Sequence, residues 1–398
     1  MINKRLESLT KNNSAIRAMF EEGNRLSSIY GKANVFDFSL GNPVVETPVE
    51  VKNEIIKALA TNDSMNLHGY MPNAGYLSVR EAIASNLNSR FSMDYSATNI
   101  VLTVGAAGGL NCILQTLLNP NDQVIVCAPF FVEYENYIHN WNGEMVVAYT
   151  NQENFSLSRE NISKCITEKT KAIIINNPNN PTGVVYSEEN IKEICTLLSL
   201  KEKEFGHPIY IISDEPYREL SYDGVIVPFI PKYYKNCIVV YSWSKSLSLP
   251  GERIGYIAIT PDAVDSELIW KATVISNRII GFVNAPSLMQ HTIEKTLSLK
   301  PNIDLYDSNR KYLFNKLSSI GYSCVYPQGA FYLWLKAPCD EKWFINEAKK
   351  YHILLVPGSS FYGDGYVRIA YCVSKECVRN SIDGFIKLWD SVTIHNRG

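Results

Sequence analysis

The 398-residue sequence lacks several features that define whole classes of protein. Its apolar runs, such as 172–175 and 238–240, are far shorter than the roughly 20 residues of a membrane-spanning helix, so we expect no membrane anchor. Basic residues form no long run, and 38 lysines and arginines are balanced by 40 acidic residues. This balance argues against a nucleic-acid partner, because such proteins bind phosphates through an excess of positive charge.

The nine cysteines and six histidines show no metal-binding or disulfide pattern. No Cys-x-x-Cys or His-Glu-x-x-His motif is present, and the closest cysteines, Cys372 and Cys377, have four residues between them. We therefore expect no metal and no disulfide, but reduced and buried thiols. The polar first 17 residues also lack the apolar stretch of a signal peptide, which predicts a cytoplasmic protein.

What the sequence does have is an ordinary globular composition and an alternating pattern in its middle part. Hydrophobic residues make up 46% and charged residues 20%, and the length predicts two domains. Short β-branched runs alternate with helical patterns such as 109–118 and 187–200, which is typical of an α/β domain with a mostly parallel sheet flanked by helices. Strands are predicted at 100–104, 123–127, 145–148, 172–176, 209–213, 238–242 and 256–259.

The pattern changes after about residue 290. A long amphipathic helix over 289–319, strands near 329–335 and 366–370 and a closing helix predict a smaller α+β domain. The chain begins with a helix and a strand-like segment at 35–41. We predict three parts: an N-terminal segment that joins the small domain (1–48), a large domain (49–290) and a small C-terminal domain (291–398).

The strongest chemical signal is a lysine that follows a predicted apolar strand, in Ser-Trp-Ser-Lys at 242–245. Lysine is rarely buried, and desolvation or a nearby cation lowers its pKa so that the amine can attack a carbonyl carbon. Arg253 follows Lys245 by eight residues, across a Pro-Gly turn. Two cations in one site would suit a phosphate and an aldehyde, although a surface lysine in a loop is the alternative.

Two further strand ends carry polar side chains. Asp214 ends an apolar run, where a carboxylate needs a partner such as a protonated ring nitrogen, and Tyr217 lies three residues later. Asn180 lies in the turn Asn-Asn-Pro-Asn-Asn-Pro-Thr-Gly at 176–183, where its amide can donate to an oxygen. A helix N-cap for Asp214 and a ligand-free turn for Asn180 are the alternatives.

Three weaker signals complete the set. The small residues around Ala106 and Ala107 lie between a strand and a helix, where backbone N–H groups can bind a phosphate. Phe131 could stack on a ring, and Arg368, inside an apolar strand, could bind a carboxylate through two hydrogen bonds. Each has a structural alternative, but together these groups supply what a pyridoxal phosphate (PLP) site requires.

With these motifs in this order, the sequence resembles the fold-type I PLP-dependent aminotransferases, within the class I/II group that includes aspartate aminotransferase. The resemblance runs from Phe-Asp-Phe-Ser-Leu-Gly-Asn-Pro at 36–43 to the strand of Arg368. It implies a PLP fold-type I large domain and transfer of an amino group from an L-amino acid to a 2-oxo acid, with 2-oxoglutarate or pyruvate as the acceptor.

The resemblance also implies roles for single residues. Lys245 would form the Schiff base with the cofactor, and Asp214 would pair with the pyridinium nitrogen. Tyr217 and Asn180 would contact the ring hydroxyl oxygen, and Phe131 would stack on the ring. The phosphate would be held by Ser242, Arg253 and the backbone of Ala106 and Ala107.

Substrate and partner contacts follow from the same resemblance. Arg368 would bind the substrate α-carboxylate, assisted by Asn180 and the backbone at Gly41. Tyr70 resembles the tyrosine that reaches the phosphate of a neighbouring subunit, which implies a homodimer with shared active sites.

Three features bear on the substrate, and two of them are departures from the family pattern. Ala106-Ala107 stands where relatives often carry a hydroxyl or a lysine, which disfavours aspartate specificity. Arg278, before the turn at 283–286, is an alternative ligand for a distal carboxylate. Gly-Asn-Pro at 41–43 replaces the more usual pattern, so this loop could shape a different pocket.

Other functions were weighed on the same residues. A PLP-dependent lyase that performs β-elimination, of the C–S lyase type, or a cyclase or oxidase would use the same site. A regulator that senses PLP or an amino acid would need an appended DNA-binding domain. An NAD oxidoreductase is disfavoured because no Gly-x-Gly-x-x-Gly follows the first strand.

Overall fold

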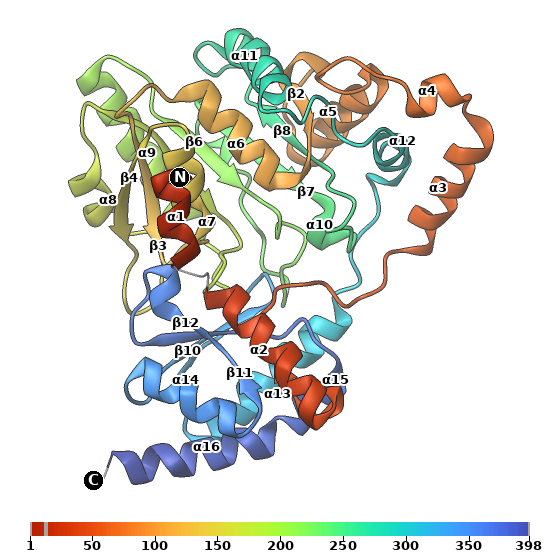
Figure 1. The fold of residues 1–398 in the computed structure, drawn as a ribbon. Coiled ribbons are helices and arrows are strands. Elements are labelled where there is room, and N and C mark those ends of the chain that lie inside the picture. The colour runs from red at the N-terminus through yellow and green to blue at the C-terminus, as the bar shows by residue number, and fades with distance from the viewer. Residues whose placement is uncertain (1, 12–14, 397–398) are drawn as a thin grey trace. The chain divides into compact units, whose positions relative to one another are not determined.

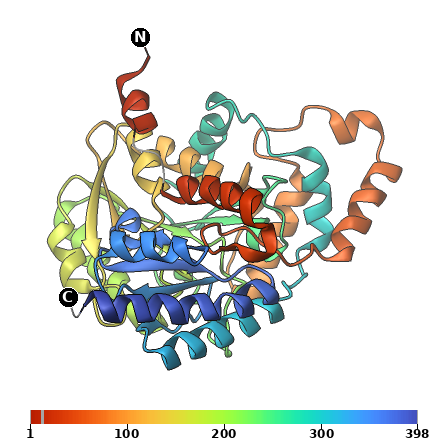
Figure 2. The same cartoon turned by 60° about the horizontal axis from the view of Figure 1, so that its bottom comes forward.

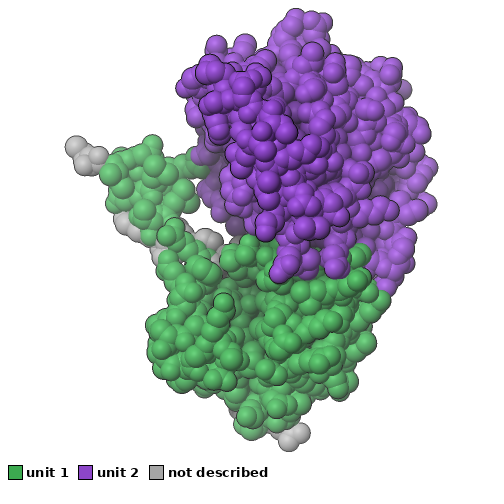
Figure 3. All heavy atoms as spheres, turned by 90° about the vertical axis from the view of Figure 1, so that its right-hand side faces the viewer, with its two compact units in different colours: residues 1–44, 180–184, 303–398 green, residues 45–179, 185–302 purple. Residues whose placement is uncertain are grey.

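The computed structural model describes residues 2–11 and 15–396, which divide into two compact units (Figure 3). Unit 1 comprises Met1–Val44, Asn180–Val184 and Ile303–Gly398, and unit 2 comprises Val45–Asn179 and Val185–Asn302. The predicted domain boundaries were near residues 48 and 290, whereas the units change at Val45 and Ile303. The short segment Asn180–Val184 groups with unit 1, which the sequence analysis did not predict.

Unit 2 is built on a seven-stranded sheet with the order β2-β8-β7-β6-β5-β3-β4. Strand β8 is antiparallel to both neighbours and the other pairs are parallel, which confirms the predicted mostly parallel α/β sheet. Most strand residues are buried, as expected where helices cover a parallel sheet. The strands are β2 (Ile100–Thr103), β3 (Gln123–Ala128), β4 (Glu144–Tyr149), β5 (Thr170–Asn176), β6 (Tyr210–Asp214), β7 (Cys237–Ser242) and β8 (Gly255–Ile259).

The helices of unit 2 connect and flank these strands (Figure 1). They are α3 (Val49–Thr61), α4 (Ser64–His68), α5 (Leu77–Phe91), α6 (Gly105–Leu117), α7 (Glu133–Asn140), α8 (Arg159–Cys165), α9 (Glu188–Phe205), α10 (Trp243–Ser246), α11 (Ser266–Ile279) and α12 (Ser287–Thr296). Helix α9 shows how local chemistry sets their ends. The Ser187 side chain accepts a hydrogen bond from the Asn190 N–H at its start, and Gly206 ends it in the left-handed region.

Unit 1 is the predicted smaller α+β domain. Its four-stranded sheet has the order β12-β13-β10-β9, and β1 pairs with β11 in a second, parallel ladder. The strands are β1 (Phe36–Asp37), β9 (Cys324–Val325), β10 (Tyr332–Lys336), β11 (Ile353–Leu354), β12 (Val356–Pro357) and β13 (Tyr366–Ala370). The helices are α1 (Lys4–Lys11), α2 (Ala15–Tyr30), α13 (Asp304–Ile320), α14 (Glu341–Lys350), α15 (Lys375–Asn380) and α16 (Ile382–His395). Helix α16 packs against both α13 and α14 (Figure 2).

The prediction of one helix over 289–319 is wrong. The chain forms α12 and then α13, and the segment between them contains Pro301. Proline has no N–H to donate and restricts the residue before it, so a helix cannot continue through this point without losing hydrogen bonds. No helix among residues 2–11 and 15–396 is both long and apolar enough to cross a membrane.

One glycine allows the sheet and the start of α6 to approach each other. Gly255 begins β8 and is in register with Ser242 of β7 and Thr103 of β2. A Cβ at Gly255 would lie 2.4 Å from the Tyr241 carbonyl oxygen and 3.0 Å from backbone atoms of Gly105. Both neighbours are main chain, so neither can move aside as a flexible side chain would.

Replacement of Gly255 by alanine should therefore destabilise unit 2. We expect Gly255→Ala to lower the free energy of unfolding by about 1–3 kcal/mol, as overpacking typically does. Gly251→Ala is the matched control, because nothing lies within 4 Å of its Cβ position. Urea unfolding of both variants checks this, and equal stabilities would contradict it.

Candidate active site

Three neighbouring strands end in polar residues at one edge of the unit 2 sheet. Asn176 ends β5, Asp214 ends β6 and Ser242 ends β7. Asn176 is directly in register with Asp214, and Asp214 with Val240, two residues before Ser242. The carboxyl ends of parallel strands are where ligands bind in open α/β sheets. The structure thus brings two of the predicted site residues, Asp214 and Ser242, to the same sheet edge.

Asp214 is the buried charge at this edge, only 4% exposed. Its Oδ2 accepts a hydrogen bond of 2.5 Å from the Tyr134 hydroxyl, and the Asn176 amide donates to its main-chain oxygen at 3.0 Å. Its Oδ1 is buried and has no hydrogen-bond partner in the part of the chain that is described. Burial raises the pKa of Asp214 to about 7, while the Tyr134 hydrogen bond acts in the opposite direction. A cationic donor at Oδ1 would stabilise the ionised form.

Tyr134 is a site residue that the sequence analysis missed. It lies on α7, is fully buried and stacks on Phe130 at 6.2 Å with an interplanar angle of 13°. Phe131 meets Tyr134 edge-on at 84° and is only half-buried, whereas Phe130 is buried. Tyr134 is three residues from Phe131, but it is 80 residues from Asp214, so no local pattern indicated their contact.

Lys245 lies on α10, the single turn that follows β7. Ser242 caps this turn, since its side chain accepts a hydrogen bond of 3.1 Å from the Ser244 N–H. Trp243, Ser244 and Ser246 are buried, whereas Lys245 is half-buried. The turn therefore presents the lysine directly after the strand end, as the sequence predicts.

The start of α6 has backbone N–H groups that no side chain caps. No side chain caps this helix at Val104, so the N–H groups of its first turn, which includes Ala106 and Ala107, lack an intrahelical partner. Arg253 is exposed and donates to the Val104 carbonyl at 3.3 Å and to the Pro250 carbonyl at 2.8 Å. The Ser242 hydroxyl donates to the neighbouring Ile254 carbonyl at 3.2 Å, which places Ser242 and Arg253 on adjoining segments.

Arg368 is a buried cation of unit 1, on β13 and 2% exposed. It donates to the Ser39 carbonyl at 2.7 Å and to the Asn180 side-chain oxygen at 3.1 Å, and its guanidinium lies 4.5 Å from the ring of Tyr332. A Cβ at Gly41 would lie 2.0 Å from the Tyr332 hydroxyl oxygen, so only glycine fits there. Arg368 and Gly41 thus both lie at the Tyr332 ring, and Arg368 also contacts Asn180.

The remaining predicted residues are exposed or lie in the turn after β6. Tyr70 follows α4 and is 97% exposed, and Arg278, near the end of α11, is also exposed. Tyr217 is 5% exposed.

Comparison with known proteins shows to which family a chain with these residues belongs. Residues 33–385 match the family model of the class I and II aminotransferases. The chain belongs to this family. It is 31% identical to a probable N-acetyl-LL-diaminopimelate aminotransferase of Bacillus subtilis, over 88% of both chains. It is 30% identical to an aspartate aminotransferase of Geobacillus stearothermophilus, over 96% of both chains.

Solved structures agree with this assignment. An amino transferase from Eubacterium rectale superposes with a TM-score of 0.96 at 41% identity, covering 98% of this chain and 99% of that one. The aspartate aminotransferase of Thermus thermophilus with maleate gives a TM-score of 0.85 at 26% identity, over 98% and 99%. This chain is therefore an aminotransferase that uses PLP, and the relatives do not favour the lyase alternative.

The residues of this aminotransferase fit the cofactor. The unsatisfied, buried Oδ1 of Asp214 suits a protonated ring nitrogen, and the uncapped start of α6 beside Arg253 suits a phosphate. Phe131 is half-buried.

The turn that carries Tyr217 is fixed by a buried ion pair in the aminotransferase. Glu215 is 1% exposed, accepts a hydrogen bond of 2.6 Å from the Ser213 hydroxyl and forms an ion pair with Arg218. Arg218 also donates to the carbonyls of Val227 and Pro228, both at 3.0 Å. Its guanidinium lies near the rings of Phe91 and Phe229, at 5.3 and 5.2 Å.

Removal of Arg218 should cost far more than removal of an exposed arginine. Loss of one partner of a buried pair typically costs about 3–5 kcal/mol, because the other charge stays buried. We expect Arg218→Met to lower the free energy of unfolding by that amount. Arg90→Met is the control, since its ion pair with Glu219 (2.7 Å) is partly exposed and should contribute about 1 kcal/mol or less. Denaturant unfolding measures both, and similar losses would contradict the expectation.

The raised pKa of Asp214 should appear in the pH dependence of stability of the cofactor-free protein. Between its ordinary value of 3.8 and about 7, the unfolded chain releases the Asp214 proton while the folded chain keeps it. The free energy of unfolding therefore falls as pH rises through this window, by up to about 4 kcal/mol, and then levels off.

Asp214→Asn should remove this fall, so the variant gains stability relative to the natural protein between about pH 4 and pH 8. The exposed Asp262→Asn serves as the control and should leave the pH profile unchanged. Thermal or urea unfolding at a series of pH values makes the measurement. Parallel profiles for the natural protein and Asp214→Asn would overturn the assignment.

Proposed function

We propose that this aminotransferase moves an amino group from an L-amino acid to 2-oxoglutarate or pyruvate with the residues identified above in specific roles. Bound PLP supplies an aldehyde carbon and a protonated ring that accepts an electron pair. The observation that carries the proposal is the buried, unsatisfied Oδ1 of Asp214 at the sheet edge that also ends in Ser242. The nine free cysteines support a cytoplasmic location, where thiols stay reduced.

Lys245 is proposed as the nucleophile and as the base. With PLP bound, its amine would hold the aldehyde carbon until the substrate amine replaces it, and it would then be free to take the proton from the substrate Cα. The same amine would return the proton, so one residue would serve both proton transfers. The half-buried position of Lys245 between buried neighbours on α10 supports this role.

Asp214 is proposed to keep the ring nitrogen protonated through Oδ1, while Tyr134 holds the other oxygen. Tyr217 and Asn180 would contact the ring hydroxyl oxygen, and Phe131 would stack on the ring. The buried Glu215–Arg218 pair supports the role of Tyr217, because it fixes the turn on which that tyrosine lies.

The phosphate is proposed to bind Ser242, Arg253 and the backbone N–H groups of Ala106 and Ala107. Tyr70 would complete the phosphate site of a partner subunit in a homodimer. Its side chain is 97% exposed, which is unusual for an aromatic residue and is consistent with a partner covering it.

The substrate α-carboxylate is proposed to bind Arg368, with Asn180 and the backbone at Gly41. Arg368 already donates to neutral oxygens of Ser39 and Asn180, so a carboxylate would add a charged partner to a guanidinium fixed in place. The turn of Ala106 and Ala107 supplies no cation for a distal carboxylate, which leaves Arg278 as the alternative ligand for an acidic substrate.

Mixing two inactive variants tests the shared site. Lys245→Ala should abolish amino transfer, and Tyr70→Ala should weaken cofactor binding and activity strongly. If Tyr70 acts in the partner's site, a hybrid dimer has one site with both defects and one natural site. Co-refolding or co-expression of the two variants should then restore about a quarter of the natural activity, since about half of random dimers are hybrids with one natural site.

The readouts separate the possible failures. Activity of Lys245→Ala at the natural rate would overturn the role of Lys245. No recovery in the mixed sample, with hybrids confirmed by mass spectrometry, would mean that Tyr70 does not act in the partner's site. Single amino donors added to the natural protein should change the cofactor's absorbance and identify the donor.

A further inference from the structure

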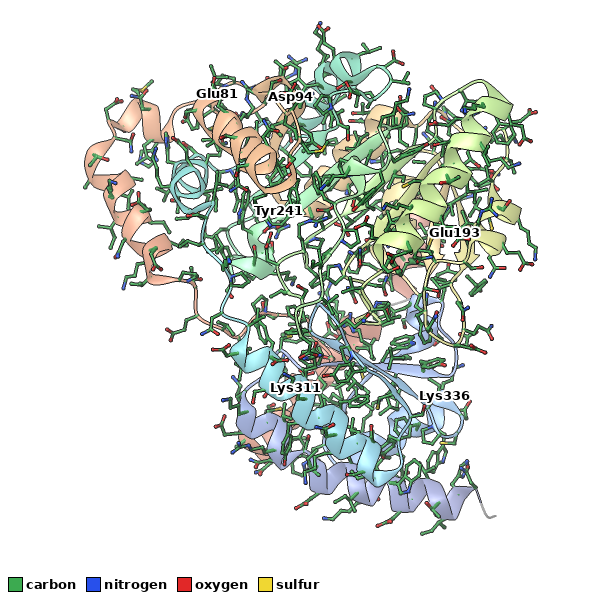
Figure 4. The ribbon with its side chains drawn as sticks, turned by 180° about the vertical axis from the view of Figure 1, so that it is seen from behind. Glu81, Asp94, Glu193, Tyr241, Lys311 and Lys336 are labelled. Atoms are coloured by element: carbon green, nitrogen blue, oxygen red, sulfur yellow. The ribbon has the colours of Figure 1, made fainter. Side chains whose placement is uncertain are left out.

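A cavity of about 530 Å³ in unit 2 has no role in the proposed reaction. We call it the α5 cavity, and its lining includes Arg90, Glu219, Tyr241, Trp243, Ser246 and Tyr256. Tyr241, labelled in Figure 4, lies on β7, and Arg90 lies on α5. The volume is in the range of sites for small ligands, roughly 300–1,000 Å³.

The floor of the α5 cavity is aromatic. The rings of Tyr241 and Tyr256 stack at 5.2 Å with an interplanar angle of 29°, and Trp243 lies 5.4 Å from each of them. Flat apolar surfaces of this kind bind planar rings by stacking or edge contacts. The floor therefore selects a ligand with an aromatic ring.

Two polar groups on this floor make no hydrogen bond among residues 15–396. They are the Tyr256 hydroxyl and the Trp243 indole N–H, whose side chains line the cavity. By contrast, the Tyr241 hydroxyl is 2.8 Å from the Ser246 hydroxyl. Both groups can donate a hydrogen bond, so they suit a ligand that carries acceptor oxygens.

The charges of the α5 cavity favour an anion. Glu219 is paired with Arg90 at 2.7 Å, and Lys300 adds a second cation to the lining, which leaves one positive charge in excess. The only hydrogen bond of the Arg90 side chain among the described residues is the one from Nη2 to Glu219, so further N–H groups can donate to an oxygen. A carboxylate meets both the charge and the donors.

The α5 cavity touches the two segments that carry the proposed catalytic groups. Trp243 and Ser246 flank Lys245 on α10, and Glu219 follows Tyr217 by two residues. A ligand in the cavity would thus contact neighbours of the nucleophile and of the residue proposed for the ring hydroxyl oxygen. Its differential contacts with these segments could shift the position of both groups.

We propose that the α5 cavity binds a small aromatic carboxylate and that a bound ligand changes the positions of the Lys245 and Tyr217 side chains. The binding part stands on the cavity alone, and the regulatory part rests on the proposed function. The site is distinct from the proposed substrate contacts, because its lining includes neither Arg368 nor Asn180.

Titration calorimetry of the holoenzyme with 4-hydroxybenzoate tests the binding. Arg90→Met should weaken the affinity about tenfold or more, and Ile83→Trp should fill the cavity and abolish binding. Arg17→Met is the matched control, because Arg17 forms an exposed ion pair with Glu21 outside the cavity. Arg368→Lys removes the proposed carboxylate ligand of the substrate site and should leave the cavity affinity within about twofold.

The outcomes of this binding experiment do not depend on whether the proposed function is correct. Binding that is lost in Arg368→Lys but kept in Arg90→Met would place the ligand in the substrate site and overturn the proposal. An absence of binding up to about 10 mM 4-hydroxybenzoate would also overturn the proposal. This outcome includes the case in which a second copy of the chain occupies the cavity and keeps the ligand out. Unfolding curves of each variant show whether it is folded.

The regulatory part has its own readout. In Arg368→Lys, saturating 4-hydroxybenzoate should shift the absorbance band of the bound cofactor, and Arg90→Met introduced into that variant should remove the shift. An unchanged band with confirmed binding would overturn the regulatory part. Failure of amino transfer in the subunit-mixing experiment would leave the calorimetric result unaffected.

Discussion

The buried carboxylate of Asp214 constrains how the neighbouring segments of unit 2 are arranged. A carboxylate at the end of a buried strand loses its hydration, and burial is the main reason that the pKa of Asp214 is raised to about 7. Tyr134 and Asn176 satisfy Oδ2 and the main-chain oxygen, but Oδ1 has no donor among the residues that the structure describes. A ligand with a cationic N–H resolves both problems, since it supplies the missing hydrogen bond and favours the ionised carboxylate. In the proposed site, cofactor binding and the stability of the fold would therefore be coupled through one oxygen atom.

That constraint explains why the surrounding segments are so firmly fixed. Asp214 can meet a ring only if the ends of β5, β6 and β7 hold their register, which side-by-side pairing provides. The turn after β6 is held by the Glu215–Arg218 pair rather than by the backbone alone. The start of α6 can approach the same edge because Gly255 has no Cβ. Packing at these three points sets the geometry before any ligand arrives.

Much of the fold was predictable because its signals are local. The strand ending in Asp214 was placed within one residue at its ends, and Lys245 was recognised because a lysine directly after an apolar strand is rare. Pro301 indicated a break between two helices, but the helical apolar periodicity continues on both sides of it and led to the prediction of one long helix. The contacts of Tyr134 with Asp214 and of Arg218 with Val227 and Pro228 depend on tertiary packing, so periodicity could not reveal them.

The segment 176–184 shows why a motif can be read correctly while its structural meaning is missed. Asn176 bonds to Asp214 within unit 2, whereas Asn180, four residues later, accepts from Arg368 within unit 1. The two prolines between and after them, Pro178 and Pro181, restrict the backbone and remove two N–H donors. The asparagines therefore do not act as equivalent turn residues. One bonds to the main chain of the residue proposed to hold the cofactor ring nitrogen, and the other orients the arginine proposed to bind the substrate carboxylate, so a change in this segment would act on both.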